Sequence, residues 1–383
     1  MEDENGKQAF IPTRVMKRNL ALEEQTFMVR KPYLEMLQYL RQVDWPAQDN
    51  LRFLLWGRLG TGKSITMSQV HHFALNSNFI VIKFHSVRRW FSNYQEAVES
   101  EFKAGRWNFP NEARTVLEDF KYYNAKKIEG MVTHKTYKWS EAELTPEGAP
   151  LSEVIESGLS RPRFSSDCLN VLLKEIKLNI QQGWSKHPVM VMIDGINVIF
   201  QERTFVSKIK PRRKSRTIPN PKSISYACTP DELSVIVAIK HLLKNDYKNA
   251  CLVASVDRHL QLDLTKRAFG ENKIWWRALQ QEMIPETDPD YPFALLGNHG
   301  WDQLHPFIPV STQDYTEGEL DAMIDYYADK RYIPHSSLRI FSIIIVYICT
   351  SFFTATLSPN QQQTKEDRKS DFSQAKIREN FTI

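Results

Sequence analysis

The sequence has few cysteines and no segment typical of secretion. Its four cysteines, Cys168, Cys228, Cys251 and Cys349, lie far apart and form no C-x-x-C pair. This spacing indicates neither a zinc site nor a disulfide framework, and it fits a reducing compartment best. The first ten residues, MEDENGKQAF, contain acidic residues and no apolar run. They indicate neither a signal peptide nor a transit peptide, and they leave open an incomplete start.

The net charge is also small for a chain of this length. The 383 residues carry a formal charge of +5, and 42% of them are hydrophobic. This composition is ordinary for a globular protein and predicts a sizeable buried core. Because the length exceeds that of one typical compact domain, we expect either one core with additions or two domains.

Acidic residues are missing altogether from residues 203–222, which contain eight Lys or Arg residues and three prolines. Such a segment predicts an exposed loop that can contact phosphates, and a solvated loop without a partner is the alternative. The candidate RNA contacts in this loop are Lys208, Lys210, Arg212, Arg213, Lys214 and Arg216.

Charge is absent from residues 340–357, an apolar run of 18 residues near the C-terminus. Its length reaches the range of a membrane span. Five of the 18 residues are Ser or Thr, and many others are β-branched or aromatic. A buried strand pair or a non-native tail is therefore an open alternative to a membrane anchor.

The glycine-rich segment at residues 57–64 reads GRLGTGKS and fits the pattern G-x-x-x-x-G-K-[ST]. The apolar run at 51–56 predicts a strand before this motif, and the periodicity of residues 65–76 predicts a helix after it. Residues 79–84, FIVIKF, predict the next strand. The motif is thus expected between the strand and the helix of a βαβ unit.

The rest of the chain indicates an α/β fold. Residues 1–45 are expected to form an N-terminal helical arm, with Pro32 in the first turn of a helix. Segment 85–187 is interpreted as a helical insertion with helices at 90–103, 111–123 and 167–182. Strands are predicted at 189–194 and 250–255, and their continuous apolar character favours a parallel sheet covered on both faces. We therefore expect a parallel-sheet P-loop NTPase core over residues 46–333.

The motif has the chemistry of a phosphate-binding loop. Glycines let successive backbone N–H groups face an anion, and the following helix N-terminus adds positive charge. Lys63 is expected to reach the β- and γ-phosphates, and Ser64 to ligate Mg²⁺. A glycine-rich turn with a solvated lysine is the alternative. The candidate nucleotide-binding residues are Gly57, Gly60, Thr61, Gly62, Lys63, Ser64 and Ile65.

Asp194, at the end of a predicted buried strand, is the candidate second Mg²⁺ ligand, and a strand-end cap is its alternative role. Gly195 follows it, where many P-loop ATPases have the glutamate that polarises water, so fast hydrolysis is not expected. Asn197 or Ser255 could orient water less effectively. The base is not specified, because no NKxD motif is present; GTP, GDP and ATP all stay open.

Several segments resemble one family. FMVRKPYLEML, GRLGTGKS followed by HHF, KYYNAKKI, PLSEVIESGLSR, MVMIDGIN, HLLKNDY, LHPFIPV and IDYYADKRY together resemble the death-associated protein 3 family, P-loop proteins of the mitochondrial small ribosomal subunit. The resemblance runs from Val15 to Ile333. From Pro334 onward we see none, although the family implies a helical lid there, so residues 334–383 are interpreted as an atypical tail.

The resemblance implies an AAA-like core in the mitochondrial matrix that holds a guanine nucleotide and Mg²⁺. It also implies contacts with small-subunit ribosomal RNA and neighbouring ribosomal proteins, and a link to apoptosis. Two functions follow from it. The first is a structural constituent of the small subunit with little hydrolysis, and the second is an active P-loop NTPase or switch protein.

Overall fold

The computed structural model describes residues 10–24, 26–92, 95–185, 187–201, 204, 206–209, 225–258 and 291–332. The chain divides into two compact units, Met1–Asp314 and Tyr315–Ile383. The first unit contains every predicted nucleotide-site residue. In the second, helix α12 (Glu317–Asp329) begins with a capping box, in which Thr316 accepts from the Glu319 N–H and Glu319 accepts from the Thr316 N–H.

The N-terminal arm consists of α1 (Thr13–Ala21) and α2 (Lys31–Gln42). Pro32 lies in the first turn of α2, where its missing N–H would have no partner within the helix. Pro32, Met36 and Leu40 are buried on one face of this helix. The helix expected to have Pro32 in its first turn is therefore confirmed as α2.

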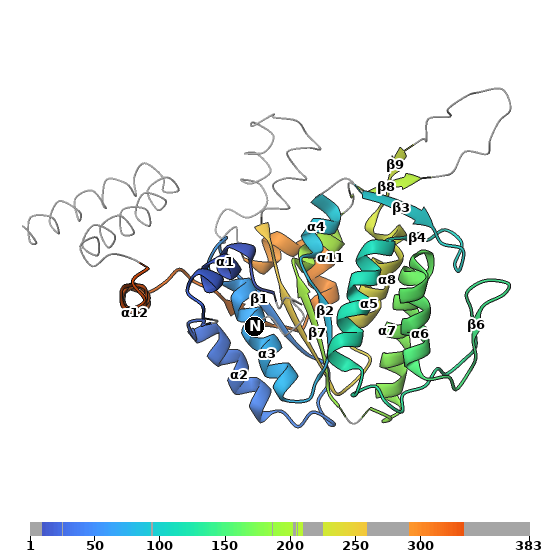
Figure 1. The fold of residues 1–383 in the computed structure, drawn as a ribbon, viewed down its shortest axis with the longest axis horizontal. Coiled ribbons are helices and arrows are strands. Elements are labelled where there is room, and N and C mark those ends of the chain that lie inside the picture. The colour runs from blue at the N-terminus through green and yellow to red at the C-terminus, as the bar shows by residue number, and fades with distance from the viewer. Residues whose placement is uncertain are drawn as a thin grey trace, which may run out of the picture. The chain divides into compact units, whose positions relative to one another are not determined.

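A parallel five-stranded sheet forms the centre of the first unit (Figure 1). The strand order is β11-β1-β10-β7-β2, and every pairing is parallel. The strands are β1 (Leu51–Trp56), β2 (Ile80–Phe84), β7 (Val189–Asp194), β10 (Ala250–Ser255) and β11 (Ile308–Ser311). The first four were predicted from their apolar runs, and the α/β parallel-sheet class is confirmed.

Helices cover both faces of the sheet, as Figure 1 shows, with α2 and α3 on one side and α5, α7 and α8 on the other. Successive strand residues alternate between two cores. In β7, Met190 and Met192 pack with the side of α3, whereas Val191 and Ile193 pack with the side of α7. Apart from α2, the helices named here and two others of this unit are α3 (Lys63–Asn76), α5 (Pro110–Asn124), α6 (Leu151–Ser160), α7 (Ser165–Gln181), α8 (Ser234–Leu242) and α11 (Pro292–Leu304).

The helices predicted at 111–123 and 167–182 are confirmed as α5 and α7. The helix predicted at 90–103 is wrong. That segment contains the end of α4 (Val87–Ser92) and then β3 (Gln95–Glu99), which belongs to a second sheet of order β4-β3-β8-β9. Ala97 is buried between the exposed Glu96 and Val98, and parallel pairing with β8 satisfies the backbone of this short strand.

The second sheet contains β4 (Trp107–Asn108), β8 (Val206–Ile209) and β9 (Ser225–Ala227) beside β3. A separate hairpin joins β5 (Tyr137–Lys138) to β6 (Leu144–Thr145). Short 3₁₀ helices occupy η1 (Pro162–Phe164), η2 (Ile196–Phe200) and η3 (Pro230–Glu232). Both sheets place loops at the ends of their strands, where function is usually found.

The apolar run at 340–357 lies outside the described residues. Within the described residues, no helix has the length and the apolar character that crossing a membrane requires.

Candidate functional site

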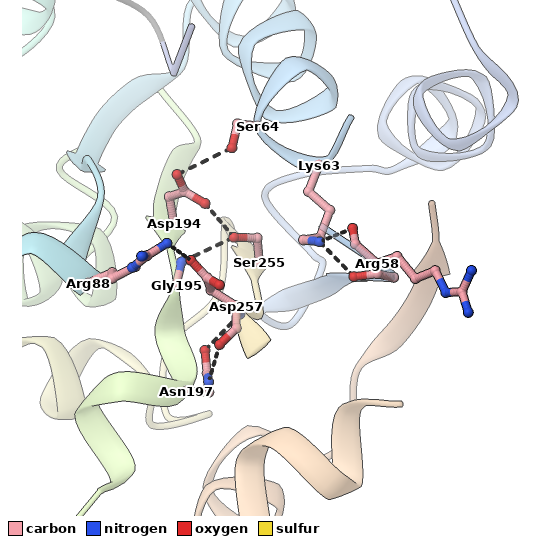
Figure 2. A network of polar contacts seen from close by, with 10 residues as sticks. Arg58, Lys63, Ser64, Arg88, Asp194, Gly195, Asn197, Ser255 and Asp257 are labelled. Atoms are coloured by element: carbon pink, nitrogen blue, oxygen red, sulfur yellow. Dashed lines mark hydrogen bonds and ion pairs between the residues drawn. The ribbon is translucent and has the colours of Figure 1, made fainter. Parts of the chain in front are cut away.

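The glycine-rich motif lies where the sequence predicts it, between β1 and α3 at the carboxyl edge of the sheet. The register of the strands determines which residues lie beside the motif. Leu55 of β1 pairs with Ser255 of β10, and Ser255 pairs with Asp194 of β7. Because parallel strands end at the same edge of a sheet, these residues and the motif converge there (Figure 2).

Ser64 and Asp194 face one another across this edge. The Ser64 hydroxyl lies 3.4 Å from Asp194 Oδ2, and the Ser255 hydroxyl donates to Asp194 Oδ1 at 2.5 Å. Two adjacent ligands of an octahedral Mg²⁺ ion lie about 3 Å apart. The Ser64 and Asp194 oxygens are therefore spaced to share one such ion. The Gly195 N–H donates to the Ser255 hydroxyl at 3.1 Å and completes a short polar chain.

Lys63 begins α3, and its side chain turns back onto the loop. Its ammonium donates to the carbonyl oxygens of Gly57 at 2.6 Å and Arg58 at 2.7 Å (Figure 2). The charge is thus held at the mouth of the loop by two neutral acceptors. A phosphate group is a stronger, charge-assisted acceptor for an ammonium group.

The loop approaches a neighbouring strand closely at one glycine. Gly57 has φ +136°, and a Cβ atom there would lie 2.2 Å from the Thr312 carbonyl oxygen. Gly60 has φ +87°, but a Cβ atom there would meet nothing within 4 Å. Both conformations favour glycine, and only at Gly57 is the missing side chain also a packing requirement.

A clamp of two residues outside the motif holds the loop, and sequence reasoning missed it. Arg30 donates to the carbonyl oxygen of Thr61 at 2.7 Å and to those of Gln313 and Asp314 at 3.0 and 3.2 Å. Thr312 shares a 2.8 Å hydrogen bond with the Thr61 hydroxyl. We call Arg30 and Thr312 the loop clamp. Thr61 is 3% exposed, and its hydroxyl also donates to the Arg58 carbonyl. It therefore stabilises the loop from its buried side.

The side chain of Asn197 forms hydrogen bonds with the backbone of Asp257. Its amide nitrogen donates to the Asp257 carbonyl at 2.9 Å, and its amide oxygen accepts from the Asp257 N–H at 2.9 Å. The Asp257 carboxylate accepts from Arg88 at 3.2 Å. Asp257 and Arg88 were not predicted as site residues. They lie just past the ends of β10 and β2, so proximity to strand ends is the signal that could have indicated them.

His85 follows β2 and belongs to the same edge of the sheet. Burial lowers the pKa of His85, and nearby Lys83 and Arg89 lower it further while Asp194 opposes them. Its Nδ1 atom is buried without a hydrogen-bond partner among the described residues, and its ring lies 5.5 Å from that of Phe10. The His85 imidazole thus lies near the Asp194 carboxylate, in surroundings that disfavour its charged form.

Only Lys208 of the predicted RNA contacts is described. Its ammonium group pairs with Glu232 at 2.6 Å and lies 5.7 Å from the centre of the Trp107 ring. Lys210, Arg212, Arg213, Lys214 and Arg216 lie outside the described residues.

The parallel sheet, the glycine loop between β1 and α3, and the acid at the end of β7 define a protein with a P-loop NTPase-like core. The family described as mitochondrial ribosomal death-associated protein 3 matches residues 27–344, and the chain belongs to this family. The match continues past residue 333, where we expected the resemblance to end, and it includes the first residues of the apolar run.

Three relatives agree with this assignment. The chain is 28% identical over 325 residues to the small ribosomal subunit protein mS29 of Bos taurus, covering 85% of this chain and 72% of that protein. The Mus musculus protein of the same name is also 28% identical, with 85% and 73% covered. The Schizosaccharomyces pombe protein is 24% identical over 188 residues, with 49% and 38% covered. These matches support a location in the mitochondrial ribosome and a structural role in its small subunit.

Proposed function

We propose that this chain is a structural component of the mitochondrial small ribosomal subunit that retains a purine nucleotide with Mg²⁺ at the glycine-rich loop. GTP or GDP is the nucleotide we favour, and ATP is the alternative. Its partners in this role are the small-subunit ribosomal RNA and the ribosomal proteins beside it. The nucleotide stabilises the fold, and hydrolysis is slow at most.

The observation that carries this proposal is the meeting of Ser64 and Asp194 at the N-terminus of α3, 3.4 Å apart. The described residues contain no cluster of three or more His, Cys, Asp or Glu side chains that could hold a metal by itself. A Mg²⁺ ion here would be held by Ser64, by Asp194 or a water on it, and by phosphate oxygens. This is how Mg²⁺ usually binds beside a nucleotide.

Retention is favoured over turnover by the groups around this site. Gly195 follows Asp194 and supplies no carboxylate, and Asp257 is paired with Arg88. Both polar ends of the Asn197 amide bond to the Asp257 backbone. The Asp257 carboxylate and the Asn197 amide are therefore engaged with the protein itself, which weakens general-base catalysis by these two groups.

An active NTPase or switch protein is the second candidate. The link to apoptosis that the resemblance implies belongs with this candidate, because signalling needs two states that a nucleotide can bias. Its structural support is the Ser255 hydroxyl, which lies at the strand end next to Asp194 and could contact a γ-phosphate.

Nucleotide binding is tested by comparing the parent chain with Lys63→Ala. Thermal unfolding is measured with and without Mg²⁺ and each of GTP, GDP and ATP. A nucleotide at 100 times its dissociation constant adds about 2.7 kcal/mol to the folded state. We expect this gain to vanish in Lys63→Ala and to persist in Lys126→Ala, an exposed lysine after α5. Unfolding without ligand is measured as well, since Lys63 also bonds to two loop carbonyls.

Three results would contradict the proposal. One is a parent chain whose stability does not respond to any of the nucleotides. Another is phosphate release by the parent chain that is fast and is lost in Lys63→Ala, which would establish the NTPase. The third is failure of the protein to co-sediment with the small subunit in salt-washed mitochondrial lysate, which would remove the ribosomal role.

A further inference from the structure

A second charged surface lies away from the glycine-rich loop, across α7, α8 and the turn between β3 and β4. Lys174 and Lys177 lie on α7, Lys240 and His241 on α8, and Lys244 just after α8. Lys103 and Arg106 lie in the turn at residues 100–106. We call these seven residues the α8 surface. They come from three segments that are far apart in the sequence, so no sequence run reveals them.

The charged groups of the α8 surface shift one another's pKa values. The pKa of His241 is lowered by partial burial and then by the cations Lys244, Lys177, Lys103 and Arg106. The pKa of Lys174 is lowered by burial and then by Lys135 and, more weakly, by Lys103. Cations that destabilise each other's charged forms lie close together in space. The surface is therefore one concentrated field of positive charge.

The acidic residues at this surface offset only part of the charge. Asp231 pairs with Lys240 at 2.6 Å, and Asp246 pairs with Lys177. Glu175 acts on Lys174 as well and raises its pKa. Lys103, Arg106 and Lys244 belong to neither pair, so positive charge exceeds negative charge on this surface. Glu101 in the same turn faces Arg163 instead. Such an excess favours a partner of high negative charge density.

The surface is also hollowed. A cavity of about 490 Å³ is lined by the apolar Val237 and Leu243, by the cations Arg106, Lys240 and Lys244, and by Asp231. Lys103 and Lys244 are exposed. Long cationic side chains around a shallow hollow can follow a ridge of phosphates.

The second sheet also ends at the turn between β3 and β4. In the second sheet β8 runs parallel to β3, and Ile209 pairs with Val98. Ile209 also pairs with Ser225, where β9 begins. The end of β8 and the start of β9 therefore lie at the end of the sheet where β3 enters the turn that carries Lys103 and Arg106.

We propose that the α8 surface docks the sugar–phosphate backbone of ribosomal RNA. This inference rests on the ribosomal role proposed above, and it does not depend on nucleotide binding. RNA is favoured over an acidic protein segment because the cations come from two helices and a turn and are in excess, which suits the closely spaced charges of a phosphate backbone. The recognition is by charge and shape rather than by base sequence.

The test measures binding of a fluorescent 20-base-pair RNA hairpin to the full chain at several salt concentrations. The variant combines Lys103→Glu with Lys244→Glu. The control combines Lys17→Glu with Lys126→Glu, two exposed lysines on α1 and after α5 that carry the same change in net charge. Thermal unfolding confirms that all three proteins are folded.

Each lost phosphate contact lowers the slope of log K against log salt by about 0.7–0.9. We expect the variant to lose about 1.5 units of slope and at least about tenfold in affinity at 100 mM salt, relative to the control. Equal slopes and affinities in variant and control would overturn the proposal. Binding of a poly-glutamate peptide more tightly than the hairpin would also overturn it, in favour of a protein partner.

Lysine acetylation provides a second readout on the unaltered protein. With the hairpin bound, Lys103, Lys174 and Lys244 should react at least about fivefold more slowly, whereas Lys17 and Lys126 in the same sample should not change. Equal protection of both sets would contradict a defined surface. A normal GTP response in the Lys103→Glu/Lys244→Glu variant separates failure here from failure of the nucleotide proposal.

Discussion

The close approach of Gly57 to Thr312 gives a direct test of how the loop is built. In Gly57→Ala the new methyl group would lie 2.2 Å from the Thr312 carbonyl oxygen and 2.8 Å from its hydroxyl. Real contacts of this kind lie beyond 3 Å, so Thr312 must move by about 1 Å. Such a shift disturbs the bonds from the Thr312 N–H and hydroxyl to the Trp56 carbonyl, which are 2.8 and 2.9 Å long.

The size of the effect follows from these contacts. A non-glycine residue at positive φ costs roughly 1–2 kcal/mol in the left-handed region near Gly60, and about 1–3 kcal/mol at Gly57, whose φ of +136° lies outside that region. Gly57→Ala adds the weakening of two hydrogen bonds, each worth about 1 kcal/mol. Overpacking against a backbone that cannot rotate away adds about 1 kcal/mol or more. We expect a loss of about 3–5 kcal/mol for Gly57→Ala and about 1–2 kcal/mol for Gly60→Ala.

Urea titration without nucleotide measures both variants, and the comparison is made between midpoints at an unchanged m value. Gly60→Ala is the matched control, because its methyl group meets nothing within 4 Å. If the two variants differ by less than about 0.5 kcal/mol, the steric part of the reasoning is refuted, and Thr312 does not lie against the loop in solution.

Three further predictions concern single side chains. Asn124→Ala should cost about 2–4 kcal/mol in a urea titration, because Asn124 bonds to the N–H and C=O of Val81, which stay buried when it is removed; a loss below 0.5 kcal/mol would contradict this. Ser255→Ala should weaken Mg²⁺ binding in the presence of GTP by about 10–100-fold in calorimetry, since its hydroxyl orients Asp194, and an unchanged affinity would disprove that role. Burial raises the pKa of Cys251 well above its ordinary 9.0, so the unfolded state releases this proton first and stability falls above pH 9. Above pH 9, the free energy of unfolding should then fall about 1.4 kcal/mol per pH unit less steeply in Cys251→Ala than in the parent chain. An unchanged dependence on pH would contradict the raised pKa of Cys251.

The parts of the fold that the sequence predicts are those whose signal is local. The central strands are buried on both faces, so each is a continuous apolar run. The glycine-rich loop is recognisable because its residue types are required at fixed spacing. The helix predicted at 90–103 failed because β3 is held between two partner strands, the short β4 nearby and β8, which comes more than a hundred residues later. The periodicity of a short charged segment does not reveal that a strand far along the chain will pair with it.

In the candidate site, too, local sequence motifs reveal some residues and miss others. Ser64 and Asp194 could be predicted, because each has a characteristic place in its motif. The loop clamp could not, because Arg30 bonds to backbone carbonyls. A carbonyl acceptor is present at every residue and leaves no mark on the sequence. Thr312 lies 251 residues from Thr61, and only the pairing of β11 with β1 brings the two together.

The loop clamp bears on the choice between a retained nucleotide and a switch. Arg30 and Thr312 hold the loop through contacts that need no nucleotide, so little ordering is left for the ligand to impose. A ligand can shift an equilibrium only by its differential affinity for two states, and a nearly complete switch requires a difference of about 10⁴-fold. A loop held in one state by Arg30, Thr61 and Thr312 offers GTP and GDP nearly the same site. Similar affinities for the two nucleotides are therefore the outcome that this geometry favours, and they fit a structural role better than signalling.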